Sequence, residues 1–213
     1  MPDWNKFIAS KIALAKKGSQ PSKSGANARV PAGQTEVKNF PRLDLGIVPD
    51  LNLQNWRLRV FGLVENELNL DWAAFQSMHQ VTEVSDFHCV TRWSRFDNRW
   101  EGVPFRAVCD LTRPKAEATH VLVHAAEGYA TNVPLKDLLE ENVLFAFQHD
   151  GTPLTPEHGG PLRLVVSKLY AWKSAKWVRG LEFLPQDRLG FWEQNGYHAY
   201  GDPFKEQRHT DDE

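Results

Sequence analysis

Short runs in which apolar and polar residues alternate recur along most of the chain and predict β-strands. The clearest run covers 56–64 (WRLRVFGLV), where apolar side chains take alternate positions. Further runs read as strands at 82–89, 119–125, 143–148, 162–167 and 177–184. Apolar residues at helical spacing predict short helices at 70–78, 104–111 and 134–141.

The predicted helices are too short to cover both faces of a sheet. We therefore expect an α+β fold, a single mixed and sheet-rich domain with long functional loops, and not a doubly wound nucleotide-binding fold. No Gly-x-Gly-x-x-Gly follows a predicted strand and no P-loop occurs, so nicotinamide or ATP binding has no support.

The N-terminal region differs in composition from the rest. Residues 1–20 carry a partial apolar stripe between lysines and predict a short amphipathic helix, whereas 17–36 are rich in Gly, Ser, Pro and Lys, as in a linker. We expect a helix with a flexible arm over 1–38, followed by one compact domain over 39–208.

Charge and cysteine content narrow the class of protein. The 213 residues include 25 basic and 27 acidic side chains, which gives no reason to expect nucleic acid or an anionic membrane as a partner. No apolar run approaches the ~20 residues that span a bilayer, and no export signal is recognisable, so we expect a cytoplasmic protein. The two cysteines, Cys89 and Cys109, exclude a disulfide framework and disfavour a Cys-rich zinc module.

Cys89 lies in a polar segment, DFHCVTRWSRFDNRW, beside His88 and shortly before Arg92 and Arg95. Nearby cations favour the thiolate, the form that binds a metal or attacks an electrophile. A small buried hydrophobe at a strand end explains the same residue about equally well. Cys109 lies on the apolar face of a predicted helix, so there the structural role is favoured.

Other chemistry for Cys89 stays open at this point. A cysteine hydrolase would need a histidine brought alongside and an oxyanion hole. A zinc site would need three or four ligands, and no Cys/His pairs of the usual spacing occur.

The segment 149–201 combines glycines, basic residues and tryptophans. Gly159 and Gly160 place His158 on a tight loop that leads into the strand of Arg163. Further positive charge, interleaved with tryptophans, comes from Lys173, Lys176 and Arg179. These residues suit a pocket for an anionic, planar ligand, although a solvated basic hairpin with structural tryptophans has the same composition.

Three segments occur in one order: CVTRWS from Cys89, HGGPLRLVV from His158, and KSAKWVRGLEF from Lys173. Together they resemble the molybdopterin-binding domain of the sulfite oxidase family, over about Phe40 to Arg208. The family includes sulfite oxidases, plant nitrate reductases and the catalytic subunit of bacterial methionine-sulfoxide repair. The resemblance implies the sulfite oxidase fold and a molybdenum–molybdopterin cofactor.

The resemblance also implies roles for individual residues. Cys89 would be the protein ligand to molybdenum, for which a soft thiolate is suited. Residues implied in binding the pterin and its phosphate are Arg42, Leu43, Asp44, His158, Arg163, Ser174, Ala175, Lys176 and Trp177. Arg92, Arg95 and Tyr197 are candidates for positioning substrate and protons, although the arginines of sulfite oxidases do not align cleanly with Arg92 and Arg95.

The function expected from the resemblance is a molybdenum-dependent oxidoreductase that performs two-electron oxygen-atom transfer. Its substrate would be a small molecule, either a sulfite-like oxyanion or an S- or N-oxide, and its electrons would pass to or from an unidentified partner. Two alternatives remain: a molybdopterin-binding module without turnover, and a metal-free cysteine-dependent enzyme.

Overall fold

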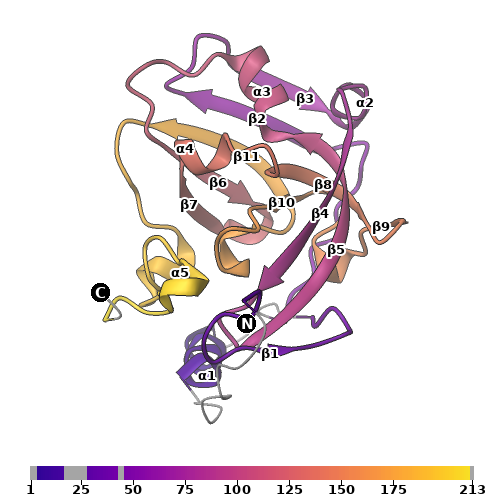
Figure 1. Cartoon of the computed structure of the whole chain (residues 1–213). Helices are drawn as coiled ribbons and strands as arrows, with labels where there is room; N and C mark the ends of the chain where they lie inside the picture. Colours follow the sequence, from indigo (N-terminus) through magenta and orange to yellow (C-terminus); the bar gives the residue numbers. More distant parts are fainter. Residues whose placement is uncertain (1–3, 17–27, 43–45, 212–213) are drawn as a thin grey trace.

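Two mixed β-sheets form the body of the protein (Figure 1). The computed structural model describes residues 4–16, 28–42 and 46–211. One sheet has the order β1-β5-β8-β10, with β4 paired to β5 and β9 to β8; the other has the order β3-β2-β11-β6-β7. The α+β, sheet-rich fold expected from the sequence is confirmed.

The strands of the first sheet are β1 (Thr35–Glu36), β4 (Val81–His88), β5 (Trp93–Pro104), β8 (Leu144–His149), β9 (Thr152–Pro153) and β10 (Arg163–Val165). Those of the second are β2 (Arg57–Gly62), β3 (Leu68–Asp71), β6 (His120–Ala125), β7 (Ala130–Pro134) and β11 (Val178–Leu184). Pairing is antiparallel except for β1 with β5 and β2 with β11.

The helices are short and connect the strands. The α-helices are α1 (Trp4–Lys16), α2 (Trp72–Gln76), α3 (Phe105–Thr112), α4 (Leu135–Leu138) and α5 (Phe191–Gln194). Single 3₁₀ turns are η1 (Ala126–Gly128), η2 (Pro156–His158), η3 (Ala171–Lys173) and η4 (Pro203–Lys205). No helix in the described ranges is both long and apolar enough to cross a membrane.

Two apolar clusters lie on opposite faces of the first sheet. Side chains alternate along a strand, so in β8 Phe145 joins the core between the sheets, whereas Leu144 and Ala146 join a second cluster on the other face. Val165 of β10 belongs to that second cluster too. The second cluster is rich in aromatic rings and includes Cys89.

Several strands were not predicted from the sequence, β5 and β7 among them. No strand was predicted just after Cys89, yet Trp93–Pro104 form the twelve-residue strand β5. β5 pairs with three neighbours, β1, β4 and β8, so its backbone hydrogen bonds outweigh its many charged side chains. The predicted helix at 70–78 begins only at Trp72, because Asp71 ends β3 and caps the helix by accepting a hydrogen bond from the Ala74 N–H at 2.8 Å.

The N-terminal helix is present as α1. The last part of the expected arm joins the sheet: Thr35 and Glu36 pair in parallel with Trp93 and Ser94 of β5. Gln34 is buried, and its side-chain amide donates to the Cys89 carbonyl at 3.0 Å. Residues 17–27 of the expected arm lie outside the described ranges.

A buried ion pair joins three loop-rich segments at one end of the sheets. Lys173 of η3 and Glu193 of α5 are both fully buried, with Nζ and Oε1 2.6 Å apart. The Lys173 ammonium also donates to the backbone carbonyl of Asn132 in β7 at 2.9 Å, and burial lowers its pKa. Glu193 accepts hydrogen bonds from the Trp172 indole at 2.9 Å and the Thr131 hydroxyl at 3.1 Å.

The sequence suggested that Lys173 contributes its charge to a ligand pocket. The structure contradicts this, because the Lys173 ammonium is buried against Glu193. The position of Lys173 next to Trp172 in the sequence gave no sign that Glu193 would meet it in the interior. Arg179 is exposed and donates to the Asn55 carbonyl. Of the three cations proposed from composition, only Lys176 lines the cavity described below.

Removing one partner of the Lys173–Glu193 pair should lower the free energy of unfolding by about 3–5 kcal/mol, because the other charge stays buried without its partner. We expect this for Lys173→Met and for Glu193→Gln, measured by urea denaturation. The double variant should lose less than the sum of the single losses. Lys205→Met removes an exposed lysine and should change stability by less than about 0.5 kcal/mol. Single variants as stable as Lys205→Met would contradict a structural role for the pair.

Candidate active site

A cavity of ≈ 160 Å³ opens beside the end of β4, on the face of the first sheet that carries the second apolar cluster. Its wall combines aromatic rings with a small number of charged and sulfur-containing side chains. The aromatic residues are Phe40, Phe87, Trp93, Tyr129, Trp172, Trp177, Trp192 and Tyr197. A mainly apolar hollow with few polar groups is the usual form of a cofactor or substrate site.

Cys89 reaches this cavity because of strand alternation. Phe87 and Cys89 are two residues apart at the end of β4 and both line the cavity. The chain then turns sharply: the Arg92 N–H donates to the Cys89 carbonyl, and the Cys89 N–H donates to the Trp93 carbonyl, both at 2.9 Å. The Cys89 sulfur is 3.1 Å from the Thr91 hydroxyl.

His88 does not accompany Cys89, although it is adjacent in sequence. It projects from the opposite face of β4, where its Nδ1 lies 2.8 Å from the Ser94 hydroxyl. Its ring is buried, and desolvation lowers the pKa of His88 to about 4. His88 is therefore neutral near pH 7 and does not act on the thiol.

Burial dominates the electrostatics of Cys89. It raises the pKa of the thiol, while the positive charges of Arg163 and Arg208 act in the opposite direction. The cations expected from the sequence, Arg92 and Arg95, are not the ones that act. A thiol in such a place is a poor free nucleophile, but binding to a metal cation removes its proton outright.

Two clamps hold the turn after Cys89 through its carbonyl groups. One is the Gln34 side chain on the Cys89 carbonyl, described above. The other is Arg208, whose guanidinium donates to the Val90 carbonyl at 3.1 Å and to the Ala32 carbonyl at 3.0 Å. The position of Cys89 thus depends on residues from both ends of the described chain.

Arg163 is the main buried cation of the cavity. It is two residues before Val165 in β10 and so faces the same side. Its Nη1 donates to the His158 carbonyl at 2.9 Å and its guanidinium lies 4.9 Å from the Phe87 ring centre. Within the described residues no carboxylate pairs with Arg163, and its Nε has no hydrogen-bond partner.

Burial lowers the pKa of Arg163 to about 10, which still leaves it charged near neutral pH. A buried cation without an anion is costly. The Trp93 indole N–H, on the same cavity wall, is also buried without a hydrogen-bond partner among the described residues. Both groups fit a polar, anionic ligand such as the phosphate-bearing pterin cofactor expected from the sequence.

The segment from Ser174 to Trp177 lines the cavity, as expected. It is fixed along β10: the Ser174 hydroxyl accepts from the Val166 N–H, and the Ala175 carbonyl from the Leu164 N–H, both at 2.9 Å. The Lys176 ammonium donates to the Glu157 carbonyl at 2.5 Å and lies 5.3 Å from the Trp177 ring centre.

His158 supports the cavity wall from behind. Its ring stacks on Phe40 at 4.5 Å, and its Nε2 lies 3.0 Å from the Phe40 carbonyl, to which it can donate. The imidazole is not among the groups that line the cavity. We conclude that His158 positions Phe40 and, through its own carbonyl, Arg163.

The 40–47 loop meets the cavity through Phe40, Pro41 and Ile47. Arg42, which was expected to bind the cofactor, is exposed and is not part of the lining. Leu43 and Asp44 lie outside the described residues.

The structure does not bring Arg92 and Arg95 to the cavity. Arg92 adopts a left-handed backbone conformation at the end of the turn and lines a second hollow with Lys16 and Arg208. Arg95 pairs with Asp150, with Nη2 and Oδ2 2.5 Å apart. Proximity to Cys89 along the chain was therefore a poor guide to proximity in space.

Tyr197 lines the cavity with Cys89. Its ring stacks on Trp192 at 4.8 Å and meets Trp172 edge-on at 5.0 Å. Burial raises the pKa of the Tyr197 phenol, and negative charge on Cys89 adds to this. The hydroxyl makes no hydrogen bond to any described residue, so it stays protonated and can donate to a ligand.

Several cavity residues were not identified from the sequence. Tyr129 donates its hydroxyl to the Trp172 carbonyl at 2.7 Å, and Glu127 and Lys11 stand on the lining from η1 and α1. None of them belongs to the three recognised segments, and no local pattern marks them.

The rival chemistries find little support in this geometry. Among the described residues, no three His, Cys, Asp or Glu side chains gather as a metal site, so zinc lacks a ligand set. A cysteine hydrolase needs a histidine beside its sulfur, whereas His88 faces away.

Comparisons with known proteins identify the family of the chain. A family model described as "Oxidoreductase molybdopterin binding domain" matches residues 45–192. The uncharacterized oxidoreductase YuiH of Bacillus subtilis (strain 168) is 46% identical over 188 residues, covering 88% of this chain and 95% of YuiH.

Two more distant proteins are similar over part of their length. The protein-methionine-sulfoxide reductase catalytic subunit MsrP of Campylobacter jejuni is 24% identical, covering 78% of this chain and 61% of MsrP. The sulfane dehydrogenase SoxCD of Paracoccus pantotrophus shares the fold, with a TM-score of 0.60 and 23% identity over 65% of this chain and 40% of that one. The family match and the cavity lead to one conclusion: the chain belongs to the oxidoreductase molybdopterin-binding domain family.

Proposed function

We propose that the protein is a molybdenum-dependent oxidoreductase that catalyses two-electron oxygen-atom transfer on a small substrate. The substrate is a sulfite-like oxyanion or an S- or N-oxide, and a separate electron-transfer partner completes the cycle. The observation that carries the proposal is the meeting of Cys89 with the buried, carboxylate-free Arg163 in one aromatic cavity. A soft sulfur ligand and an anion-binding cation are the two groups that a phosphorylated metal–pterin requires.

The cofactor, when bound, supplies the two-electron redox chemistry. Cys89 ligates the metal, and the clamped turn fixes the direction of its sulfur. Arg163 and Lys176 bind negative charge on the pterin, while the Ser174–Trp177 segment shapes its pocket. The aromatic wall excludes water, which strengthens each of these charge interactions.

Tyr197 is placed to hold a proton near the reacting atoms. Its hydroxyl has no internal acceptor among the described residues and its raised pKa keeps it protonated. We propose that it donates a hydrogen bond to the substrate. We assign no part in this step to the two arginines after Cys89, because Arg92 lines a different hollow and Arg95 pairs with Asp150.

Cys89→Ser should abolish turnover and remove the sulfur contribution of the protein from the molybdenum X-ray absorption spectrum. A hydroxyl is harder and far less acidic than a thiol and replaces it poorly as a ligand. Cys109→Ser is the matched control: Cys109 lies in the core between the sheets, so activity should persist with a modest loss of stability. An unchanged metal spectrum in Cys89→Ser would remove Cys89 from the metal.

Arg163→Ala and Lys176→Ala should each lower the molybdenum and pterin content of the purified protein. Losing a charge-assisted contact costs about 1.5–3 kcal/mol, or roughly a tenfold to hundredfold loss of affinity. Arg179→Ala removes an exposed arginine from the same region and should retain full cofactor. If both cavity variants fold and carry full cofactor, these side chains are structural and the pocket assignment fails.

Tyr197→Phe should keep the cofactor but slow turnover by about 10²–10⁴, the usual contribution of a positioned proton donor. Stopped-flow measurement of the rate at which an S- or N-oxide reoxidises the reduced metal tests this directly. The ring packing against Trp192 is retained in the variant, so stability should change little. Wild-type reoxidation with a lowered melting temperature would make Tyr197 a packing residue instead.

A further inference from the structure

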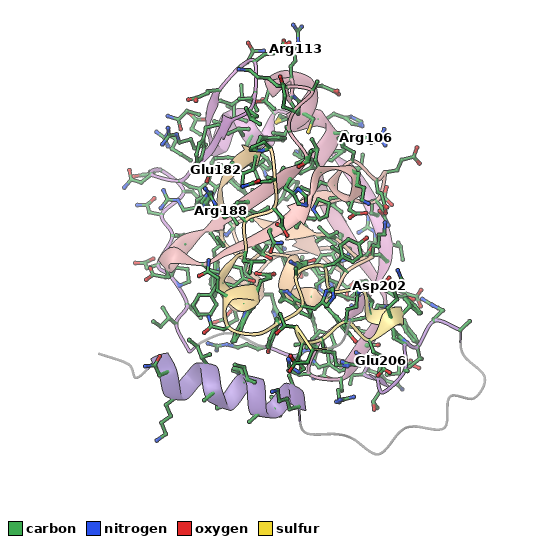
Figure 2. All side chains as sticks on the ribbon, turned by 90° about the vertical axis from the view of Figure 1, so that its left-hand side faces the viewer. Arg106, Arg113, Glu182, Arg188, Asp202 and Glu206 are labelled. Carbon is green, nitrogen blue, oxygen red and sulfur yellow. The ribbon has the colours of Figure 1, made fainter. Side chains whose placement is uncertain are left out.

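Helix α1 packs against the active-site cavity, although it precedes the region matched by the family model. Figure 2 shows α1 lying across one end of the domain, below the C-terminal segment that carries Asp202 and Glu206. One face of the helix is turned inward: Ile8, Lys11, Ile12 and Ala15 are less exposed than their neighbours, at the spacing of a helical stripe.

Contacts of this face lead to the cavity residues. Ala15 is fully buried in the same apolar cluster as Cys89, Trp93 and Tyr197, and Ile12 packs against that cluster. At the end of the helix, Lys16 lines the second hollow with Glu206. These contacts fix both the rotation and the position of α1 relative to the cavity.

The helix so placed contributes one side chain to the cavity lining, Lys11. Lys11 is half-buried and makes no hydrogen bond or ion pair with any described residue. A lysine whose only task is to cover apolar surface normally extends its ammonium to solvent. Here the lysine instead lines a hollow that already holds a buried cation, Arg163.

The charges of the lining favour an anion. Lys11, Arg163 and Lys176 are positive, and Glu127 is the one acid among the lining residues that the structure describes. A cleft lined mainly by one sign of charge, with apolar walls, concentrates ligands of the opposite sign.

We propose that α1 is a functional part of the active site and that Lys11 binds the anionic group of a ligand in front of Cys89. The inference rests on the proposed function and deepens it, because a substrate oxyanion, unlike a neutral S- or N-oxide, carries the charge that this ammonium can bind. The same ammonium chemistry suits two sources of negative charge: a substrate oxyanion and the phosphate of the cofactor. The experiment below separates them.

The first measurement uses the full-length, cofactor-free chain with Cys109→Ser, so that Cys89 is the single thiol. Cys89 is alkylated in parallel with iodoacetate, an anion, and iodoacetamide, which is neutral. The ratio of the two rates cancels changes in the access and reactivity of the thiol and reports the local charge. Lys11→Met should lower the iodoacetate-to-iodoacetamide ratio about three- to tenfold, the effect of one partly screened charge.

Two further variants serve as controls. Lys11→Arg keeps the charge and should restore the ratio. Lys6→Met removes an exposed lysine from the same helix and should leave the ratio unchanged. An unchanged ratio in Lys11→Met, or an equal fall in Lys6→Met, overturns the proposal. Since this readout needs no molybdenum, it stands even if the proposed oxidoreductase function fails.

The second measurement uses the cofactor-loaded protein and identifies the anion. If Lys11 binds substrate, Lys11→Met keeps its molybdenum content and raises KM for sulfite but not for dimethyl sulfoxide. If Lys11 binds the cofactor phosphate, molybdenum and pterin content falls while KM for the loaded fraction is retained. Unchanged content together with unchanged KM for sulfite contradicts an anion-binding role.

Discussion

The cavity depends on the buried pair of Lys173 and Glu193. Part of its wall comes from η3 and α5, short helical turns that could not hold a fixed position alone, and the pair ties both of them to β7. The pair holds these segments together, and its two side chains also form hydrogen bonds with Asn132, Thr131 and the Trp172 indole. Because an unpaired charge there is so unfavourable, arrangements that separate the segments are excluded.

The first sheet serves two purposes through its two faces. One face packs against the second sheet and forms the main core, as with Phe145. The other face carries Phe87, Cys89 and Arg163 to the cavity. Neighbouring residues of a strand alternate between these faces. The neighbours of Arg163, Leu162 and Leu164, therefore lie in the main core and limit its movement.

Much of this arrangement could be predicted from the sequence, and the errors have common causes. The strands with clear alternation, such as 56–64, were identified, and Cys89, Arg163 and Lys176 were found because each lies in a recognisable segment. His88 and Arg95 were grouped with Cys89 because they are close in sequence, yet strand alternation turns His88 to the opposite face and Asp150 binds Arg95. Lys11 could not be found, because no local pattern shows where a separate helix will pack.

The double clamp on the turn after Cys89 also has a consequence for the time at which the site is formed. Gln34 is translated before Cys89, so the residue that forms the first clamp is already part of the nascent chain when the cysteine is added. Arg208, which holds the Val90 carbonyl, emerges only after nearly the whole described chain has been translated. A nascent chain that still lacks Arg208 therefore has a cysteine loop held by one clamp instead of two.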